Sequence, residues 1–328
     1  MYKVKVSIIV PNYNYASYLQ QRIESILNQS FQNFELILLD DASTDNSAEI
    51  LYSYQDNSHV THIEINKNNT GSPFQQWFKG ISLAQGEYIW IAESDDLCEP
   101  EFLSTTVNLL DKYPQAAVCF TGSTQINEKG ETLPYDMNKW GKLERKQKNN
   151  YAIFNGKAYA IHNLYWRSYI GNASSALFRK SSFEQASPQQ CAKMRYSGDW
   201  LFWFRLAIQG DIIEVYEIQN HFRQHTKKVT VKADYNGEGK KEDVEIIYQM
   251  ELTLPEIGRY KRTIRHGILH NCIRKLPAPH LIKEGLYTLL KQKLNATASD
   301  GKIAHLNQLL RFVCPFVITM ERDRLHPK

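Results

Sequence analysis

The N-terminal part of the chain alternates short apolar runs with segments in which apolar residues recur at helical spacing. The runs have the length of buried strands and cover residues 4–10, 35–39, 61–65 and 88–92. Helical spacing occurs between them, at residues 18–27, 48–54 and 74–81. Strands that alternate with helices are typical of βαβ units. This part of the chain therefore predicts an α/β fold with a mostly parallel sheet flanked by helices.

The pattern changes along the rest of the chain. The predicted elements are a helix that ends at Tyr113, strands at 117–121, 171–178 and 212–216, and an apolar helix at 200–208. Residues 122–165 are too polar to assign, and from Val244 onward only helical patterns appear. We therefore predict a sheet domain over residues 1–225 and a helical C-terminal region over residues 226–328.

Two pairs of adjacent carboxylates come at the ends of predicted strands. Asp40 and Asp41 end the second strand, and Asp95 and Asp96 follow the fourth. Ligands of parallel α/β sheets bind beyond the carboxyl ends of the strands, so both pairs are candidates for a binding site. For any single one of these residues, a turn or cap role is the alternative. Because adjacent carboxylates repel each other, each pair requires a cation or several hydrogen-bond donors nearby.

The composition is that of an ordinary globular protein. Apolar residues make up 42% and charged residues 23% of the 328 residues, which excludes wholesale disorder. The five cysteines are an odd number without a CxxC pair, so neither a disulfide framework nor a zinc site is indicated. The N-terminus lacks the features of a signal peptide, and no stretch has the length of a membrane span. We therefore expect a cytoplasmic protein.

Charge is distributed unevenly along the chain. The total of 39 Lys and Arg against 35 Asp and Glu gives a net charge of +4, which is too small to indicate a nucleic-acid partner. Residues 251–328 hold 14 basic and 6 acidic residues, so the rest of the chain is acidic. This asymmetry indicates either contact with an anionic surface or a solvated helical face. Leucines and lysines between Leu286 and Leu294 have amphipathic spacing, which would suit peripheral contact with the inner face of the cell membrane.

Four segments occur in a characteristic order and spacing: VSIIVPNYNYASYLQQRIESILNQSF, FELILLDDASTDNS, GISLAQGEYIWIAESDD and GDWLFWFRLAIQG. Together they resemble family 2 glycosyltransferases of the GT-A fold, over roughly residues 4–225. The resemblance implies sugar transfer from a nucleotide diphosphate sugar, with inversion of the anomeric centre and with Mn or Mg as cofactor. The acceptor it implies is a glycan or a lipid-linked molecule, in bacterial-type surface polysaccharide synthesis.

The resemblance also assigns nucleotide-binding and metal-binding residues. Asp41 matches the aspartate that recognises the base, and Tyr13 matches the residue whose ring packs on the base. Pro11 and Asn14 match the first loop. Tyr13 as a core aromatic and Asn14 as a turn residue are the alternatives. By the family pattern, Asp95 contacts the ribose or a water-mediated partner. Asp96 is then the direct metal ligand, since hard divalent cations take oxygen ligands and bridge phosphates.

Asp199, in the segment GDW, matches the general base of the family. It opens a predicted helix, where backbone N–H groups and the helix dipole favour an ionised carboxylate. A plain N-cap role is the alternative. Arg223 and His225 follow the last predicted strand, where residues of the family contact the metal or the diphosphate. His225 would bind the metal through a neutral imidazole, and a surface histidine is the alternative.

The sequence departs from the family pattern in one helix. Trp77 and Phe78 stand where many members have Arg-Asn, so the donor contacts differ in part. The QxxRW-type motif of processive synthases is absent from the sequence, which favours the addition of a single sugar.

Two other classes of protein compete with a glycosyltransferase. The first is a catalytically inactive nucleotide-sugar or glycan binding module on the same fold. The presence of Asp41, Asp96 and Asp199 favours the enzyme over this module. The second is a nicotinamide-type Rossmann enzyme, which is disfavoured because no GxGxxG follows the first strand.

Overall fold

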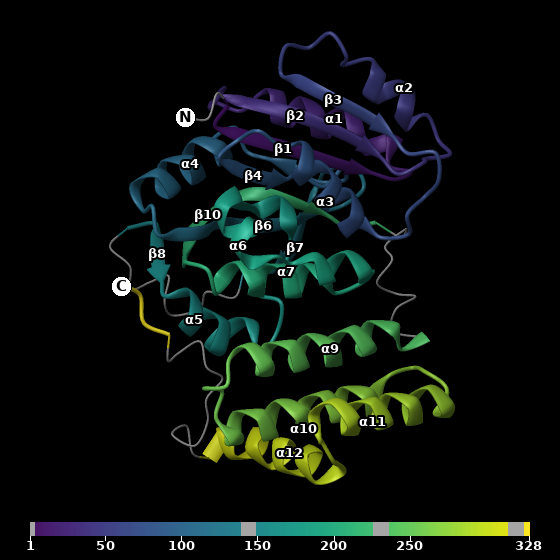
Figure 1. Ribbon diagram of the computed structural model, residues 1–328, viewed down its shortest axis with the longest axis vertical. Helices are drawn as coiled ribbons and strands as arrows, with labels where there is room; N and C mark the ends of the chain where they lie inside the picture. The colour runs from purple at the N-terminus through teal and green to yellow at the C-terminus, as the bar shows by residue number, and fades with distance from the viewer. Residues whose placement is uncertain (1–3, 139–148, 226–235, 314–324) are drawn as a thin grey trace.

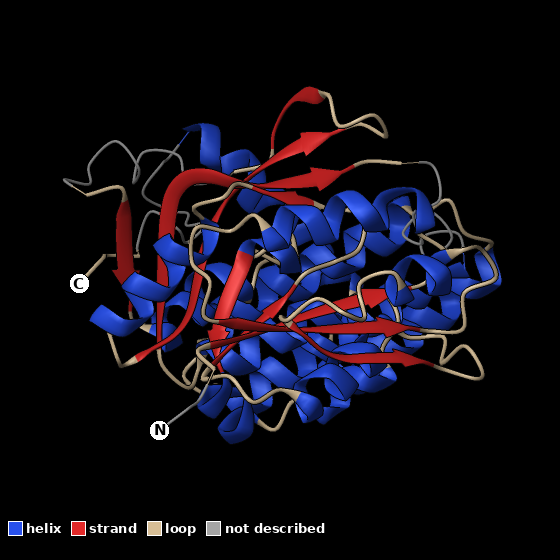
Figure 2. Cartoon of the chain, turned by 90° about the horizontal axis from the view of Figure 1, so that it is seen from above, coloured by secondary structure: helices blue, strands red, loops and turns tan. Residues whose placement is uncertain are grey.

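The structure, a computed structural model, describes residues 4–138, 149–225, 236–313 and 325–328. A twisted sheet with helices on both faces forms the upper part of the molecule in Figure 1, and the helices of the C-terminal region stack below it. Figure 2 shows the same arrangement from above, with the strands running between helices. The predicted α/β fold, with a mostly parallel sheet and a helical C-terminal region, is confirmed.

The first half of the sheet is fully parallel. In spatial order it consists of β3 (Val60–Ile65), β2 (Phe34–Asp40), β1 (Val6–Asn12) and β4 (Tyr88–Ile91). Every residue of β1, β2 and β4 is buried, as expected where helices cover both faces of a parallel sheet. The connecting helices are α1 (Ala16–Leu27), α2 (Ser47–Tyr52) and α3 (Pro73–Leu83). The loops after β1, β2 and β4 therefore meet at one edge of the sheet.

Alternate residues of the strands face two hydrophobic cores. Ile8 and Val10 of β1 belong to the core formed with α1, α2 and α4 (Phe102–Lys112). Ile9 belongs to the other core, together with α3 and α7 (Gly198–Ala207). This alternation is the period-two pattern of an extended chain. It fixes which residues at the strand ends point toward which layer of helices.

The second half of the sheet is mixed. Strand β9 (Ala176–Arg179) lies antiparallel between β4 and β6 (Ala116–Ile126), and β10 (Asp211–Arg223) runs parallel to β6. The shorter elements here are β5 (Leu97–Cys98), β7 (Thr132–Asp136), β8 (Tyr151–Phe154), α5 (Gly156–Tyr159) and α6 (Lys180–Ala186). Strands β7 and β8 and helix α5 fall in the stretch that the sequence pattern left unassigned.

Two strands differ from their predicted extent. Strand β10 continues to Arg223, well past its predicted end, because it stays paired with β6 over that length. The preceding predicted strand begins only at Ala176. Before it, Asn172 accepts a hydrogen bond from the Ser174 backbone N–H at 2.7 Å, and this cap starts a short 3₁₀ turn. Both differences bring residues to the acidic pair that follows β4.

The helical region packs directly against the sheet domain. It contains α9 (Glu238–Thr253), α10 (Arg259–Lys275), α11 (His280–Leu294) and α12 (Ala298–Val313). Glu251 of α9 accepts a hydrogen bond from Tyr165 Oη at 2.6 Å, and its carboxylate lies 2.7 Å from Nε2 of His266 in α10. Ile247 of α9 shares one hydrophobic core with Trp200 of α7. The predicted division at 225/226 borders on residues outside the described ranges and stays a prediction.

The amphipathic face predicted between Leu286 and Leu294 is not exposed. Leu286, Leu290 and Leu294 are buried in α11 and belong to the hydrophobic core that α9 shares. The apolar side of α11 is therefore a core face, and the prediction that it faces a membrane is wrong. Within the described residues, no helix has both the length and the apolar character needed to cross a membrane.

Candidate active site

Loops from distant parts of the chain meet at the carboxyl edge of the parallel strands. Tyr13 follows β1, Asp41 follows β2, Asp95 follows β4 and His225 follows β10. Asp95 and His225 are in direct contact, with 2.9 Å between Oδ2 of the carboxylate and Nε2 of the imidazole. Residues separated by more than a hundred positions thus form one pair, as expected for a site built at this edge.

Asp41 is only 4% exposed and is surrounded by donors from the protein itself. Its carboxylate accepts hydrogen bonds from Asn66 Nδ2 at 2.7 Å, the Thr70 backbone N–H at 3.0 Å and Gln76 Nε2 at 2.8 Å. These donors offset the repulsion between Asp41 and the adjacent Asp40. Asp41 therefore orders the loops around the predicted base position. Recognition of a base by this carboxylate requires one of these bonds to be exchanged.

The loop after β1 presents one aromatic ring to solvent. Tyr13 is 45% exposed, which suits a ring that packs on a ligand. Asn14 has a φ of 59°, and its Oδ1 accepts a hydrogen bond from the Thr44 backbone N–H at 2.7 Å, which joins the first loop to the second. Pro11 is buried, and its carbonyl accepts a hydrogen bond from Ser94 Oγ at 2.6 Å. Pro11 and Asn14 thus shape the loop that displays Tyr13.

The two members of the second acidic pair have different environments. Asp96 is 1% exposed and accepts hydrogen bonds from Asn172 Nδ2 (2.9 Å), Ser174 Oγ (2.7 Å) and the Arg223 backbone N–H (3.0 Å). Burial, followed by the charge of Asp95, raises the pKa of Asp96. The side chain of Asp95 retains 14% exposure. The more accessible carboxylate is therefore that of Asp95, whereas the family resemblance predicted Asp96 as the direct metal ligand.

Aromatic rings hold His225 beside Asp95. The rings of Tyr15 and Tyr18 lie 5.2 and 5.7 Å from the imidazole, measured between centroids. Nε2 of His225 faces Asp95, while its Nδ1 is buried and has no hydrogen-bond partner among the described residues. Across the described ranges, no three His, Cys, Asp or Glu side chains form a metal cluster. A cation held by Asp95 and His225 would need further oxygen ligands from a substrate or from water.

Arg223 is occupied by the protein itself. Its Nε donates to the carbonyl of Asp95 at 2.7 Å, and Nη1 donates to the carbonyls of Asn127 and Glu128 at 3.1 and 3.0 Å. The guanidinium therefore fastens the loop after β4 to the end of β6. These contacts occupy the guanidinium, so Arg223 is not available for the diphosphate contact that the family resemblance suggested.

Trp77, which stands in place of the family's arginine, also reaches this loop. Its Nε1 donates to Oε1 of Glu93 at 2.8 Å. Burial, followed by the charge of Asp95, raises the pKa of Glu93 to about 8. Glu93 is therefore mostly protonated at neutral pH, so it does not add a third negative charge to the acidic pair.

Asp199 lies in the first turn of α7, as predicted. The cap position belongs to Ser197, so a plain N-cap role for Asp199 does not fit the helix. Burial raises the pKa of Asp199 to about 6. Backbone N–H groups of the first turn lower this pKa, and the charges of Asp243 and Glu242 raise it. The helix end packs closely on α3, because a Cβ at position 198 would lie 2.6 Å from Phe74 Cε2.

The helical region holds the segment before Asp199. Glu242 of α9 accepts hydrogen bonds from three successive backbone N–H groups, those of residues 195–197, at 2.7–2.9 Å. Asp243 accepts a hydrogen bond from Ser197 Oγ at 3.1 Å. Two carboxylates of α9 therefore fix the approach of the chain to α7. They also place negative charge near Asp199.

Sequence analysis missed the residues that hold the site together. Asn172 and Ser174 come from the run GNASS, and a small polar run directly before an apolar strand was the available indication of their role. Tyr18 lies in the first turn of α1, where the sequence pattern read it as a helix-face residue, and Tyr15, directly before α1, was not interpreted. Nothing in the sequence pointed to Glu242, because its partners are backbone groups distant along the chain.

The mostly parallel sheet with helices on both faces is an α/β fold of the GT-A type. The chain belongs to glycosyl transferase family 2, which it matches over residues 7–186, more than half of its length.

Among named relatives, the glycosyltransferase GlyG of Streptococcus pneumoniae is 41% identical over 100 residues, 30% of this chain and 33% of GlyG. The putative teichuronic acid biosynthesis glycosyltransferase TuaG of Bacillus subtilis is 30% identical over 132 residues, 40% of this chain and 52% of TuaG. The matched part of the chain thus spans a third to about a half of these relatives.

Solved structures share the fold at low sequence identity. Staphylococcus aureus TarS, residues 1–349 in complex with UDP, has a TM-score of 0.64 and 16% identity, covering 98% of this chain and 88% of that one. The mannosyltransferase PcManGT of Pyrobaculum calidifontis, in complex with GDP-Man and Mn²⁺, has a TM-score of 0.55 and 14% identity, covering 96% and 82%. The matches cover nearly all of the chain, so the fold extends beyond the family segment.

Proposed function

We propose that the protein is an inverting glycosyltransferase that moves one sugar from a nucleotide diphosphate sugar to a glycan or lipid-linked acceptor. The observation that carries the proposal is the Asp95–His225 pair at the carboxyl edge of the sheet, next to an exposed Tyr13. Membership of family 2 supports it. So do two neighbours of the same fold, TarS with UDP-GlcNAc and PcManGT with GDP-Man and Mn²⁺.

The donor would lie along the sheet edge in the order of the strands. Its base would meet Tyr13 and Asp41 at the ends of β1 and β2, and its diphosphate would lie at the end of β4 beside Asp95. The ring of Tyr13 offers a stacking face. Thr70 and Gln76, which already bind Asp41, supply further polar groups near the base.

Asp95 and His225 fit a divalent cation. Bound there, the cation would act as a Lewis acid that neutralises the departing diphosphate. We assign the ligand role to Asp95 rather than Asp96, because three protein donors already engage Asp96. Magnesium prefers oxygen-only coordination, so the imidazole of His225 favours Mn²⁺.

Asp199 suits the role of general base. An inverting transfer is a single displacement, so one base takes the proton of the acceptor hydroxyl as its oxygen attacks. With a pKa of about 6, Asp199 is ionised at neutral pH yet more basic than an ordinary carboxylate. Helix α3 links Asp199 to the donor loops. Its Phe74 packs on the start of α7, and its Gln76 donates a hydrogen bond to Asp41.

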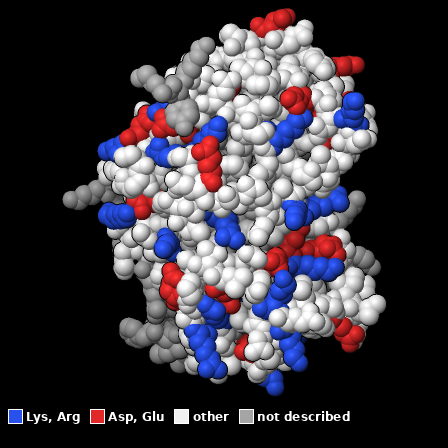
Figure 3. Space-filling view, viewed as in Figure 1, with Lys and Arg blue, Asp and Glu red and all other residues white. Residues whose placement is uncertain are grey.

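The proposed setting is surface polysaccharide synthesis in the cytoplasm, at the inner face of the membrane. The relative TuaG, a putative teichuronic acid biosynthesis glycosyltransferase, supports the pathway class. Lys and Arg side chains gather over the helical region in the lower part of Figure 3, with acidic residues among them. On α12, the side chains of Ile303, Leu306 and Leu309 are 42–56% exposed and recur at a spacing of three residues. We propose that these three side chains of α12 contact the membrane, since the apolar side of α11 is buried.

A donor screen followed by a transfer assay tests the proposal. Nucleotide sugars with different bases and sugars are added with and without Mn²⁺, and the melting temperature is recorded. A ligand at 100 times its Kd adds about 2.7 kcal/mol to the free energy of unfolding. We expect one donor class to stabilise the protein in a Mn²⁺-dependent manner, and its nucleotide to be released when acceptor is supplied. Failure of every nucleotide sugar at millimolar concentration would overturn the proposal. Tight donor binding without any turnover would favour the inactive binding module.

A further inference from the structure

A cavity of about 140 Å³ lies next to the acidic pair and takes no part in the roles proposed above. Its walls come from β6, from the residues just after β7 and from residues 167–175. Asn172 belongs to one wall, and its Nδ2 donates to Asp96 at 2.9 Å. The cavity therefore adjoins the proposed diphosphate position, on the side of the sheet where β9 and β6 follow β4.

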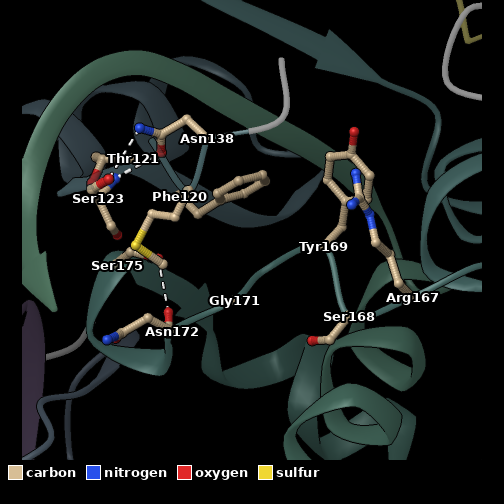
Figure 4. A pocket seen from close by; sticks show the side chains of 11 residues that line it. Phe120, Thr121, Ser123, Asn138, Arg167, Ser168, Tyr169, Gly171, Asn172 and Ser175 are labelled. Carbon is tan, nitrogen blue, oxygen red and sulfur yellow. Dashed lines mark hydrogen bonds between the residues drawn. The ribbon is translucent and has the colours of Figure 1, made fainter. Parts of the chain in front are cut away.

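The lining of this cavity combines aromatic rings with hydroxyl and amide groups. Phe120 of β6 points toward Tyr169 and Arg167, which come from the opposite wall (Figure 4). Ser123 and Asn138 line another side, joined by two backbone–amide hydrogen bonds of 2.9 and 3.0 Å. Apolar ring faces beside fixed polar groups suit a sugar, whose ring has an apolar face and polar edges. A cavity of about 150 Å³ holds one benzene ring, so this one has room for part of a single pyranose, with the remaining atoms outside it toward the exposed Arg167.

Arg167 gives the cavity its charge. It is the one charged side chain among the described residues that line it, and no Asp or Glu is among them. Its guanidinium lies 4.9 Å from the centre of the Tyr169 ring and is exposed, and it forms no ion pair with any described residue. Stacking on tyrosine orients the planar fork of N–H donors without occupying it. Such a fork matches a carboxylate in a bidentate manner.

We propose that this cavity binds a pyranose that carries a carboxylate, a hexuronate, with its ring against Phe120 and its carboxylate on Arg167. The inference rests on the proposed function, because it names a sugar of the donor or of the acceptor. The strand order places the cavity beyond the diphosphate position, where the transferred sugar and the acceptor end meet. A hexuronate in either position, as the transferred sugar or as the end of the acceptor, would present a carboxylate to Arg167.

Titration with small sugars tests the cavity without any need for turnover. Methyl glucuronide and methyl glucoside are titrated into the full chain, saturated with UDP and Mn²⁺ or free of both, and binding is followed by ligand-observed NMR. An exposed, hydrogen-bonded charge pair predicts that the glucuronide binds about 2- to 5-fold more tightly. Arg167→Gln should remove this preference, and Arg167→Lys should retain part of it because the charge stays while the fork is lost.

The matched control removes one exposed arginine elsewhere. Arg274→Gln, on α10 and outside the cavity lining, should leave the preference unchanged. Equal binding of the two sugars to the unmodified chain would overturn the proposal, as would a preference that survives Arg167→Gln. Absence of detectable binding of either sugar at tens of millimolar would overturn it as well.

The source of the hexuronate follows from a second pair of ligands. UDP-glucuronic acid and UDP-glucose are compared in the same variants. A preference for UDP-glucuronic acid that depends on Arg167 identifies the transferred sugar. A preference confined to the free glycoside with UDP bound identifies the acceptor.

Different outcomes would refute the proposed function and the cavity assignment. Sugar transfer that is equally efficient with neutral sugars and in Arg167→Gln would overturn the cavity assignment alone. Hexuronate binding through Arg167 without binding of any nucleotide sugar would overturn the proposed function alone.

Discussion

The substitution Asp199→Asn is expected to raise the free energy of unfolding at neutral pH while it removes most of the turnover. Asp199 is partly buried at the start of α7, near the carboxylates of Asp243 and Glu242. Its ionised form is therefore unfavourable in the folded protein, although a general base needs that form. Asn has similar size and removes the charge.

The size of the stability gain follows from the pKa. The ordinary value is 3.8, and the folded value is about 6. Because the folded state holds the proton more tightly, stability falls as pH rises from about 4 to about 6 and then levels off. A shift of about two units corresponds to about 3 kcal/mol, which partial exposure reduces to about 1–3 kcal/mol. Asp199→Asn should recover this amount above pH 6 and nothing near pH 4.

Thermal unfolding at several pH values measures this difference. For a chain of this size we expect a rise of a few degrees at pH 7.5 and none at pH 4. Asp45→Asn provides a control of opposite sign. Burial opposes ionisation of Asp45, but hydrogen bonds from Ser47 and the Ala16 backbone outweigh it and lower its pKa. The charge of Asp45 thus stabilises the fold above its unfolded pKa, so Asp45→Asn should destabilise at neutral pH.

Turnover supplies the second half of the test. Loss of a general base costs about 10²–10⁴-fold in rate, with donor affinity nearly unchanged. A destabilised Asp199→Asn with near-normal turnover would refute the reasoning, because that pair of results indicates a helix-stabilising carboxylate.

Three further predictions concern the metal, the general base and the membrane. Asp95→Asn should abolish the Mn²⁺-dependent part of nucleotide binding in calorimetry. Asp96→Asn should instead lower the melting temperature, because it turns an amide N–H toward the groups that donate hydrogen bonds to Asp96. The reverse outcome would assign the metal to Asp96. Asp243→Asn keeps an acceptor for the nearby serine and removes a charge that raises the pKa of Asp199. The acid limb of the kcat/KM profile should then move to lower pH, and an unmoved limb would reject this link. Leu306→Ser on α12 should weaken co-sedimentation with anionic vesicles at low salt, and equal binding to neutral vesicles would remove the role of charge.

Much of the fold follows from local patterns. Strands β1, β2 and β4 are buried at every position and mostly apolar because both faces of the sheet are covered, and this makes them visible in the sequence. The end of β10 was not visible, because the polar residues Glu217, Gln219 and Asn220 interrupt the apolar pattern while pairing with β6 resumes from Ile218. Buried α11 was taken for a surface helix because a periodic apolar face has the same spacing whether it packs on protein or on lipid.

The site was predictable by residue type but not by orientation. The sequence placed two carboxylates in the segment between β4 and β5 but did not indicate how each side chain is oriented. Which of the two stays accessible depends on Asn172 and Ser174, which fold back from another segment. Similarly, His225 was named from its position, but the tyrosine rings that fix it lie about two hundred residues earlier.

The helical region bears on catalysis through two carboxylates of one helix. Glu242 accepts hydrogen bonds from the three backbone N–H groups that lead into α7, so α9 determines where Asp199 begins its helix. The same helix carries Asp243, whose charge raises the pKa of Asp199. Glu251, farther along α9, accepts a hydrogen bond from Tyr165 of the sheet domain. Position and basicity of the proposed base therefore depend on a helix outside the segment that the family shares.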